Sequence, residues 1–186
     1  VDDSISQVNF LLNSMEGNFS FMLTRPNGIK VAANDPDVIL IDSGSAQYYK
    51  VLNPALGIWQ AQISGNGEYI FRTSADSTIQ FAYLGDVQAS PGTMMQLATR
   101  VSGLVSALTF ELEDTNGQLL DTVELFDKGI LGDFSAGDGV YTGVYTPTIS
   151  GDLRIRLKGQ TKLGNTFFRT DSRLIRIRNL SITAPP

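Results

Sequence analysis

The sequence predicts an all-β fold in which two β-sandwich domains follow one another along the chain. Short apolar runs alternate with a period of two residues, and Gly, Asn, Asp and Pro separate them. No stretch carries the apolar stripe of an amphipathic helix. About seven such runs fall in each half, the number expected of an immunoglobulin-like sandwich. We therefore expect two tandem immunoglobulin-like β-sandwich domains, at residues 1–88 and 93–186, joined around Val87–Gly92.

The individual strands follow from the apolar alternation. In the first domain they are expected at Gln7–Leu12, Asn18–Leu23, Val38–Ile41, Gln47–Leu52, Ile58–Ile63, Tyr69–Thr73 and Thr78–Leu84. In the second they are expected at Met94–Val101, Ala107–Glu113, Leu119–Leu125, Val140–Thr146, Leu153–Lys158, Thr166–Thr170 and Arg173–Ile182. Proline cannot donate to a ladder, so Asn53-Pro54 and Thr146-Pro147 are expected to end the strands that precede them.

Three sequence landmarks recur in the same order in both halves, which indicates an internal repeat. The matched pairs are "FMLTRPNG" (Phe21–Gly28) with "FELEDTNG" (Phe110–Gly117), "GIWQAQISG" (Gly57–Gly65) with "GDLRIRLKG" (Gly151–Gly159), and "GEYIFRT" (Gly67–Thr73) with "GNTFFRT" (Gly164–Thr170). We expect the two domains to be related copies of one plan.

Each landmark has a structural explanation. The two Asn-Gly pairs suit tight turns, since glycine adopts positive φ without steric cost. Because side chains alternate between the faces of a strand, Trp59, Ala61 and Ile63 are expected to face the core together. Phe71 and Phe168 stand at matching positions of the third landmark, and both are expected to be core residues.

Composition excludes several classes of chemistry. The chain has no cysteine and no histidine, so it has no disulfide, no Ser-His pair and no thiolate or imidazole zinc site. The absence of disulfides favours a bacterial exported protein. The net charge of −5 argues against nucleic-acid or anionic-membrane partners, and the basic residues of Arg169–Arg178 alternate with apolar ones, as on the solvent face of a strand. No apolar run is long enough for membrane insertion.

The densest acidic and glycine-rich stretch is "FDKGILGDFSAGDGVYTG", from Phe126 to Gly143. It offers Asp127, Asp133 and Asp138 as oxygen ligands for calcium, which takes six to eight oxygens. Their spacing does not fit the alternate positions of an EF-hand. The alternative is a set of turns in which aspartate side chains accept hydrogen bonds from nearby backbone N–H groups.

An enzymatic interpretation exists for "LIDSGSA", from Leu40 to Ala46. Asp42, Ser43 and Gly44 resemble the catalytic loop of aspartic peptidases, in which two carboxylates share a proton. Such a site needs two copies of the motif, from two lobes or from a homodimer, and the second half of this chain contains none, so an aspartic-type hydrolase stays the less favoured alternative. We therefore expect Asp42 to belong to a hairpin turn and assign no catalytic residue.

Other polar and aromatic side chains are candidates for sugar sites. Glu111, Glu113 and Glu124 could serve glycoside hydrolysis by residue type, but they alternate along strands and are expected to face solvent. Exposed aromatic rings could bind carbohydrate, and the candidates are Tyr48, Tyr49, Tyr141 and Tyr145. Gly143, between the last two, would allow a flat ligand to approach, although the core explanation is favoured for these tyrosines.

Two stretches carry a family resemblance. "VLNPALGIWQAQISGNGEYIFRTSADSTIQFAYL" (Val51–Leu84), with the opening "VDDSISQVNFLL", resembles the Ig-like segment that follows the von Willebrand A domain in hemicentin-like proteins. "GDFSAGDGVYTGVYTPTISGDLRIRLKG" resembles the Asp-Gly-x-Tyr-Thr sandwiches of secreted bacterial surface proteins and of chloride-channel accessory proteins.

The resemblance implies a non-catalytic structural or interaction module of a larger exported or cell-surface protein, beside a von Willebrand A-type adhesive domain. The A domain itself, with its Asp-x-Ser-x-Ser metal motif, is expected to lie outside this chain, which begins at Val1 as a processed protein or a fragment would. Its partners would be other domains of the parent protein or an extracellular protein or glycan. A carbohydrate-binding or calcium-stabilised adhesion module is the alternative, and the oligomeric state stays open.

Overall fold

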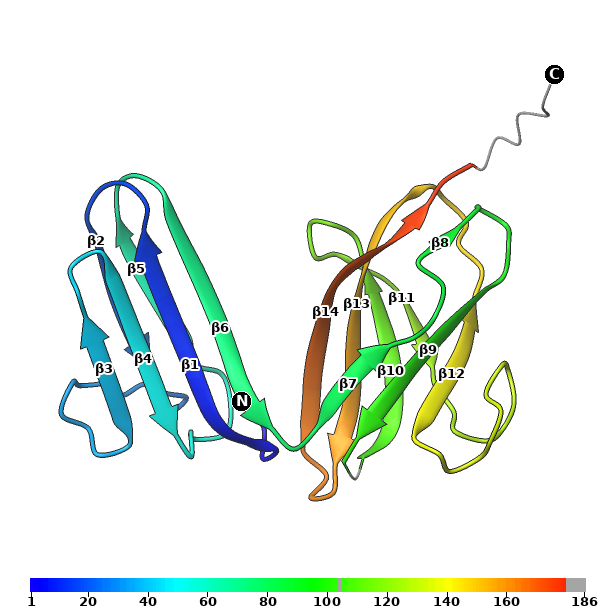
Figure 1. Ribbon diagram of the computed structural model, residues 1–186, viewed down its shortest axis with the longest axis horizontal. Coiled ribbons are helices and arrows are strands. Elements are labelled where there is room, and N and C mark those ends of the chain that lie inside the picture. Colours follow the sequence, from blue (N-terminus) through cyan, green and yellow to red (C-terminus); the bar gives the residue numbers. More distant parts are fainter. Residues whose placement is uncertain (104, 180–186) are drawn as a thin grey trace. The chain divides into compact units, whose positions relative to one another are not determined.

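The computed structural model describes residues 1–103 and 105–179, and it confirms the all-β prediction (Figure 1). The described residues form fourteen strands and no helix. Consequently, no helix among them could cross a membrane. The chain divides into two compact units, one from Val1 to Thr78 and one from Ile79 onward.

The first unit has two antiparallel sheets. Its strands are β1 (Ile5–Ser14), β2 (Phe19–Thr24), β3 (Val38–Asp42), β4 (Ala46–Leu52), β5 (Gln60–Gly65) and β6 (Tyr69–Ser77). One sheet has the order β3-β4-β1-β6, and β2 pairs with β5 in the other. Alternate residues of β1, namely Val8, Phe10 and Leu12, face the core, where they join Phe21 and Leu23 of β2.

The second unit is an eight-stranded sandwich. Its strands are β7 (Gln80–Tyr83), β8 (Gln88–Ala89), β9 (Met95–Ser102), β10 (Val105–Glu113), β11 (Leu119–Glu124), β12 (Val140–Tyr145), β13 (Gly151–Thr161) and β14 (Thr166–Ile177). A five-stranded sheet has the order β11-β10-β13-β14-β8, and a three-stranded sheet has the order β12-β9-β7. All pairings are antiparallel except that of β8 with β14.

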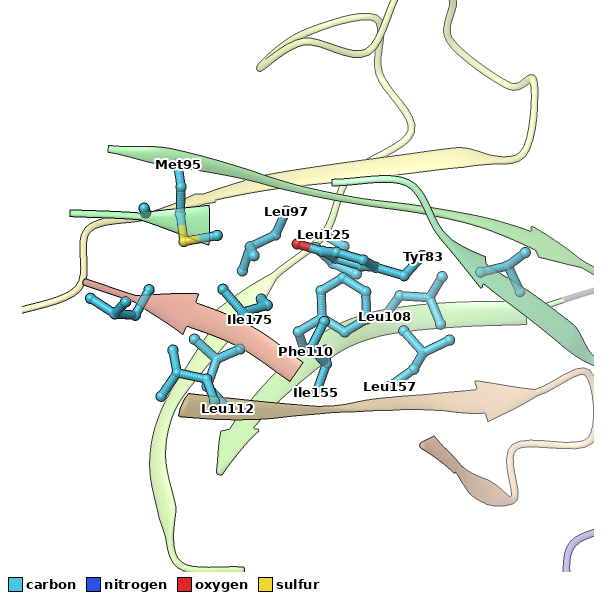
Figure 2. Packing of buried hydrophobic residues seen from close by; sticks show 14 of the residues in the cluster. Tyr83, Met95, Leu97, Leu108, Phe110, Leu112, Leu125, Ile155, Leu157 and Ile175 are labelled. Carbon is cyan, nitrogen blue, oxygen red and sulfur yellow. The ribbon is translucent and has the colours of Figure 1, made fainter. Parts of the chain in front are cut away.

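The core of the second unit lies between these sheets (Figure 2). Phe110, Ile155 and Leu157 come from the five-stranded sheet, and all three side chains are fully buried. Leu97 and Tyr83 meet them from the three-stranded sheet, with the rings of Tyr83 and Phe110 5.8 Å apart in an edge-on arrangement. This packed interior fixes the positions of the loops that leave its strands.

The first two repeat landmarks correspond in structure as well. Phe21 and Leu23 are buried in β2, as are Phe110 and Leu112 in β10. Each Asn-Gly pair places its glycine at positive φ, +83° at Gly28 and +85° at Gly117. The second landmark, Gly57–Gly65 and Gly151–Gly159, contributes β5 and β13, which pair with β2 and β10 respectively. The repeat therefore captures one matching pair of strands in each unit.

The third landmark does not correspond, and the prediction for Phe168 is wrong. Phe71 packs against the first core, as expected, but Phe168 is 46% exposed and its neighbour Phe167 is 1% exposed. The strands also pair differently, because β6 lies beside β1 whereas β14 lies beside β13. The same Phe-Arg-Thr sequence therefore directs its phenylalanine side chain toward the core in the first unit and away from the core in the second.

Two boundaries of the second unit differ from the prediction. The segment Thr78–Leu84 is expected from the sequence in the first domain, but β7 pairs with β9 and Ile79 is buried in the second core. The units therefore meet between Thr78 and Ile79. Val87–Gly92 is not a linker between domains. Its residues Gln88 and Ala89 form β8, which pairs with β14, and the backbone N–H of Arg176 donates to the carbonyl oxygen of Val87 at 2.9 Å.

The other predicted strands are present, with one fusion. Thr166–Thr170 and the start of Arg173–Ile182 form one continuous strand, β14, and residues 180–182 of that prediction lie outside the described residues. The register of β14 against β13 shifts between Arg154 and Arg156, whose partners are Leu174 and Thr170, and β14 continues as one strand across this irregularity. Both proline breaks are confirmed, because β4 ends at Leu52 and β12 at Tyr145.

Candidate metal centre and neighbouring sites

The acidic loop joins β11 to β12 and is fastened to the three-stranded sheet at several points. Phe126 and Thr142 exchange backbone hydrogen bonds in both directions, each at 2.9 Å. The Thr142 hydroxyl donates to the carbonyl oxygen of Ile130, and the Gln96 side-chain amide donates to that of Leu131. Thr142 is fully buried, so the base of the loop is anchored inside the sandwich.

Positive φ angles shape the loop. The glycines at 129, 132, 137 and 139 have φ between +66° and +86°, a region that favours glycine. Leu131 has φ +55°, which is unusual for a residue with a branched side chain. The loop's turns therefore depend on its glycine-rich sequence and bring distant aspartates together.

The three predicted metal ligands converge. Asp127, Asp133 and Asp138 each offer a carboxylate oxygen, and these oxygens all lie within 4.8 Å of one another. Asp133 is buried at 6% exposure, whereas Asp138 is exposed. The sequence predicted these three residues as a group, and the structure brings their oxygens together.

The same carboxylates also organise the turns. The oxygens of Asp127 accept hydrogen bonds from the backbone N–H groups of Gly137 and Gly139, at 2.5 and 3.0 Å. Those of Asp133 accept from Gly129 at 2.6 Å and from Ser135 at 3.1 Å. These are the turn bonds that the alternative interpretation predicted. These bonds leave the metal interpretation open, since a carboxylate oxygen has a second lone pair after accepting one N–H.

The second feature of this cluster is its net negative charge. Among the described residues, none of the three aspartates forms an ion pair with lysine or arginine. The nearby Lys128 instead places its ammonium 4.6 Å from the centre of the Phe126 ring. Hard carboxylate oxygens are the donors that calcium and magnesium prefer, so the donor set fits such a cation.

Asp42 occupies the hairpin turn expected of it. One of its carboxylate oxygens accepts from the backbone N–H of Gly44 at 2.9 Å, and the other accepts from the side-chain amide of Gln47 at 2.8 Å. The bond from Gly44 and the bond from Gln47 lower the pKa of Asp42. An aspartic dyad works with one carboxyl kept protonated, whereas this environment favours the ionised form.

Glu111 and Glu113 are not solvent-facing, so that prediction is wrong. Each is 6% exposed, although both stand on the outer face of the five-stranded sheet. The Arg156 guanidinium covers them, at 2.6 Å from Glu111 and 2.9 Å from Glu113, and Lys158 lies 3.3 Å from Glu111. Burial acts to raise the pKa of Glu111, but the hydrogen bonds from the two cations outweigh it and lower the pKa. Glu124 is exposed, as expected.

The tyrosine pair does not form a flat platform. Tyr141 and Tyr145 both pack against the second core, and burial raises the pKa of each phenol. They line two different hollows. The close approach at Gly143 is made by the protein itself, since the backbone oxygen of Glu124 lies 2.6 Å from where a β-carbon would stand. These positions favour the core explanation.

The tyrosines of the first unit are held by polar and aromatic contacts. Tyr49 is a core residue whose ring meets that of Phe21 edge-on at 5.1 Å. The Tyr48 hydroxyl donates to the side-chain oxygen of Asn9 at 2.8 Å on the opposite face of β4.

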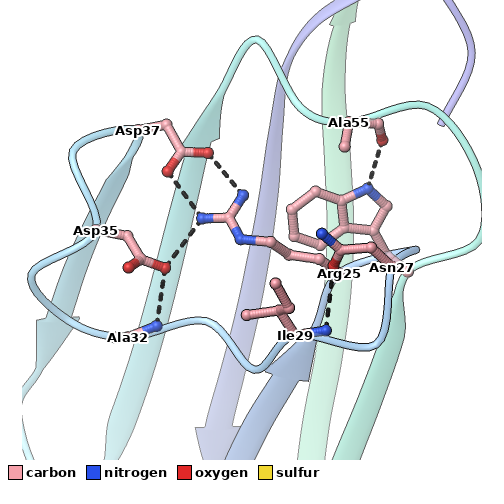
Figure 3. Close-up of polar contacts among 8 residues, drawn as sticks. Arg25, Asn27, Ile29, Ala32, Asp35, Asp37 and Ala55 are labelled. Carbon is pink, nitrogen blue, oxygen red and sulfur yellow. Dashed lines mark hydrogen bonds and ion pairs between the residues drawn. The ribbon is translucent and has the colours of Figure 1, made fainter.

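An arginine clamp in the first unit was not anticipated from the sequence (Figure 3). The Arg25 guanidinium binds both carboxylate oxygens of Asp37, at 2.7 and 2.8 Å, and one oxygen of Asp35 at 3.0 Å. It also stacks over Trp59, 5.5 Å from the ring centroid. These bonds lower the pKa of Asp37. The only sequence signal for this clamp was the closely spaced acid pair Asp35 and Asp37 in "DPD". Their partner, Arg25, lies ten residues or more earlier, after another strand.

Trp59 lies at the margin of the first core, as expected. Its ring is 6.1 Å from that of Phe10, and its indole N–H donates to the carbonyl oxygen of Ala55 at 2.9 Å. Ile63 packs against the same core, but Ala61, which was predicted to accompany them, is exposed.

The residue pattern Asp-x-Ser-x-Ser does occur in the chain, at Asp2–Ser6. There the Asp2 carboxylate accepts from the backbone N–H of Ser4 at 3.1 Å and from its hydroxyl at 2.5 Å. The segment leads directly into β1 of a sandwich. The pattern therefore opens a strand here and does not place an A domain in this chain.

Two of the solved structures that resemble this chain align with it at low TM-scores. The fibronectin(III)-like modules of Clostridium thermocellum CbhA align at 11% identity and a TM-score of 0.34, covering 96% of this chain and 81% of theirs. The titin domains z1z2, determined in complex with telethonin, align at 11% identity and a TM-score of 0.28, covering 94% and 89%. At TM-scores this low, neither likeness supports a statement about the chain. No curated protein matches it.

A family match is more informative. The family described as the conditioned medium factor second Ig-like domain matches residues 72–177. The match begins in β6 and ends with the last residue of β14, so it includes every strand of the second unit and more than half of the chain. The chain therefore belongs to the family of the conditioned medium factor second Ig-like domain.

Proposed function

We propose that this chain is a non-catalytic structural and interaction segment of a larger exported or cell-surface protein. The observation that carries the proposal is the connection between its two sandwiches. β6 ends at Ser77 and β7 begins at Gln80. Of the two residues between them, Thr78 donates its backbone N–H to Ser4 of the first unit, and Ile79 is buried in the second core. A spacer needs domains that each have a hydrophobic core and that follow one another directly along the sequence. This chain has two such domains.

The chemistry of the polar side chains supports a non-catalytic role. Histidine and cysteine are absent, which removes the commonest general base and the strongest neutral-pH nucleophile. Asp42 is committed to a turn, and the buried Glu111 is committed to an ion pair. Immunoglobulin-like domains typically serve as structural or interaction modules.

The position beside a von Willebrand A domain rests on the resemblance of Val51–Leu84 to hemicentin-like segments. An antibody raised against this chain tests both the setting and the neighbour. We expect it to detect, in the medium or on the cell surface, a protein larger than the 20.2 kDa of this chain. Mass spectrometry of that protein should give peptides of an A domain outside the present sequence. A cytoplasmic protein of the chain's own mass would contradict the proposal.

A second function is favoured by one observation, the convergence of three carboxylates that form no ion pair with a lysine or arginine of the described residues. We infer that the loop between β11 and β12 binds a calcium ion that stabilises the second sandwich. Asp127, Asp133 and Asp138 would hold it, and the ion would neutralise their charge. The remaining ligands would be carbonyl oxygens or water, as is usual for calcium.

Calorimetric titration tests the calcium site. We expect one calcium ion to bind per chain, and Asp138→Asn to weaken binding roughly tenfold or more, since affinity follows ligand charge. Asp138 is the better target because it is exposed and its carboxylate accepts from the backbone N–H of nearby Val140, whereas Asp133 is buried and shapes the loop. Asp121→Asn, an exposed acid outside the cluster, should leave binding unchanged. Equal binding by all three proteins would contradict the assignment.

A further inference from the structure

The second sandwich has a hollow of about 460 Å³ between β11 and β12. β11 ends the five-stranded sheet and β12 ends the three-stranded sheet, so each pairs with one neighbouring strand among the described residues. At one end the two strands are held close by the bridge from Phe126 to Thr142 and by the contact of Glu124 with Gly143. Beyond that point the hollow opens toward Asp121 and Tyr145.

The edge of β12 presents backbone hydrogen-bonding groups to this hollow. Thr142 directs its N–H and C=O away from β9, because both bond to Phe126. Alternation along the strand turns the same groups of Val144 to that side. Val144 stands opposite Gln96 of β9. The backbone N–H and C=O of Gln96 both bond to Asp86, on the side away from β12, which agrees with this register. The described residues contain no strand paired with β12 at Val144, which leaves this edge open.

The charge of the hollow is negative. Asp121 and Glu124 line it, and no lysine or arginine is among its lining residues. Asp121 is close enough that its charge adds to burial in raising the pKa of Tyr145. Apolar surface lies beside the acids, since Val144 is 38% exposed and Leu131 is 44% exposed. A ligand that fits would be extended, basic at some positions and apolar at others.

We propose that the hollow between β11 and β12 docks an extended basic peptide segment, which adds to the edge of β12 at Val144 as a new strand. Backbone bonds to Val144 would align the segment, and its lysine or arginine side chains would face Asp121 and Glu124. Its apolar side chains would cover Val144 and Leu131. The proposal deepens the structural and interaction role, on which it rests, by naming the class of partner.

Fluorescence anisotropy with a labelled heptapeptide of alternating lysine and valine tests the proposal on the whole chain. We expect saturable binding at moderate salt and roughly tenfold weaker binding of the glutamate-valine counterpart. Val144→Pro removes the outward N–H without breaking a pair with β9, so it should keep the fold and abolish binding. Val144→Thr keeps the N–H and should bind as the unaltered chain does.

The charge is tested separately. Asp121→Asn with Glu124→Gln should weaken lysine-valine binding roughly tenfold, while the exposed Glu68→Gln in the first unit should have no effect. If Val144→Pro fails to fold, the comparison of the Asp121→Asn/Glu124→Gln variant with Glu68→Gln still tests the proposal. Three outcomes would overturn the proposal. The two peptides could bind equally, or folded Val144→Pro could bind as well as the unaltered chain. The hollow could also bind cellohexaose, a probe for the carbohydrate alternative, in place of the peptide. None of these outcomes bears on whether the parent protein is exported, so the two proposals fail separately.

Discussion

The backbone oxygen of Glu124 lies 2.6 Å from the point where a β-carbon on Gly143 would stand. This contact brings the edge strand of one sheet against the edge strand of the other. The side chains of Val123 and Leu125 lie 2.9 and 3.1 Å from the same point, but the nearest atom belongs to the backbone, so a β-carbon there would require the backbone to move. Glycine is required at this position for space, since its φ is not in the left-handed region.

Gly143→Ala should therefore destabilise the second sandwich by roughly 1–3 kcal/mol, the range for an overpacked site. Gly151→Ala is the matched control, because that glycine also stands at a strand position and a β-carbon added there would have nothing within 4 Å. The control should change the free energy of unfolding by less than about 0.5 kcal/mol. Urea denaturation of the two variants measures both values, and equal effects would refute the steric explanation.

Arg156→Met should destabilise the same unit by roughly 2 kcal/mol, because it leaves Glu111 and Glu113 buried without their main cation. The loss stays below that of a fully buried pair, since the arginine side chain is 37% exposed and Lys158 remains. Arg154→Met, on the same strand, is the comparison. Should the two variants unfold at the same urea concentration, the cover over the glutamates contributes nothing to stability.

The lowered pKa of Glu111 predicts a pH dependence. Its folded pKa lies below that of the unfolded chain, about 4.3, so its contribution to stability is present above that value and is lost as the pH falls through the folded pKa. Glu111→Gln should consequently cost more stability at pH 7 than at pH 3. Exposed Glu68→Gln should show no such difference. A constant cost of Glu111→Gln across this range would contradict the assignment.

Arg25→Lys should lower the stability of the first sandwich by roughly 1–2 kcal/mol. Lysine retains the charge but cannot bond to both oxygens of Asp37 at once or stack flat on Trp59. Arg72→Lys, an exposed change on β6, should have little effect. Trp59 fluorescence during urea unfolding reports this unit directly, and an unchanged midpoint for Arg25→Lys would show that the bidentate geometry is dispensable.

The sequence was sufficient to predict features that depend on local periodicity. Alternation located the strands, and glycine with proline located their ends, as at Pro54 and Pro147. The convergence of Asp127, Asp133 and Asp138 was also predictable, because one glycine-rich loop holds all three. These features depend on neighbours in the chain.

Features that depend on strand pairing were not predictable. Thr78–Leu84 has the same alternation whichever unit it joins, and only its pairing with β9 assigns it to the second. Phe167 and Phe168 compete for one inward position, and the register of β14 against β13 decides between them. Arg156 buries Glu111 only because β13 lies beside β10. The hollow at Val144 likewise results from the edges of two different sheets.

The most direct test of a structural role is thermal unfolding with and without millimolar calcium, followed by two signals. Trp59 is the only tryptophan and reports the first sandwich, while calorimetry reports both. We predict that calcium raises the transition of the second sandwich by roughly 3–6 °C, leaves the Trp59 transition in place, and has no effect on Asp138→Asn. An unchanged second transition in the unaltered chain would show that the three aspartates serve only the turns of the loop.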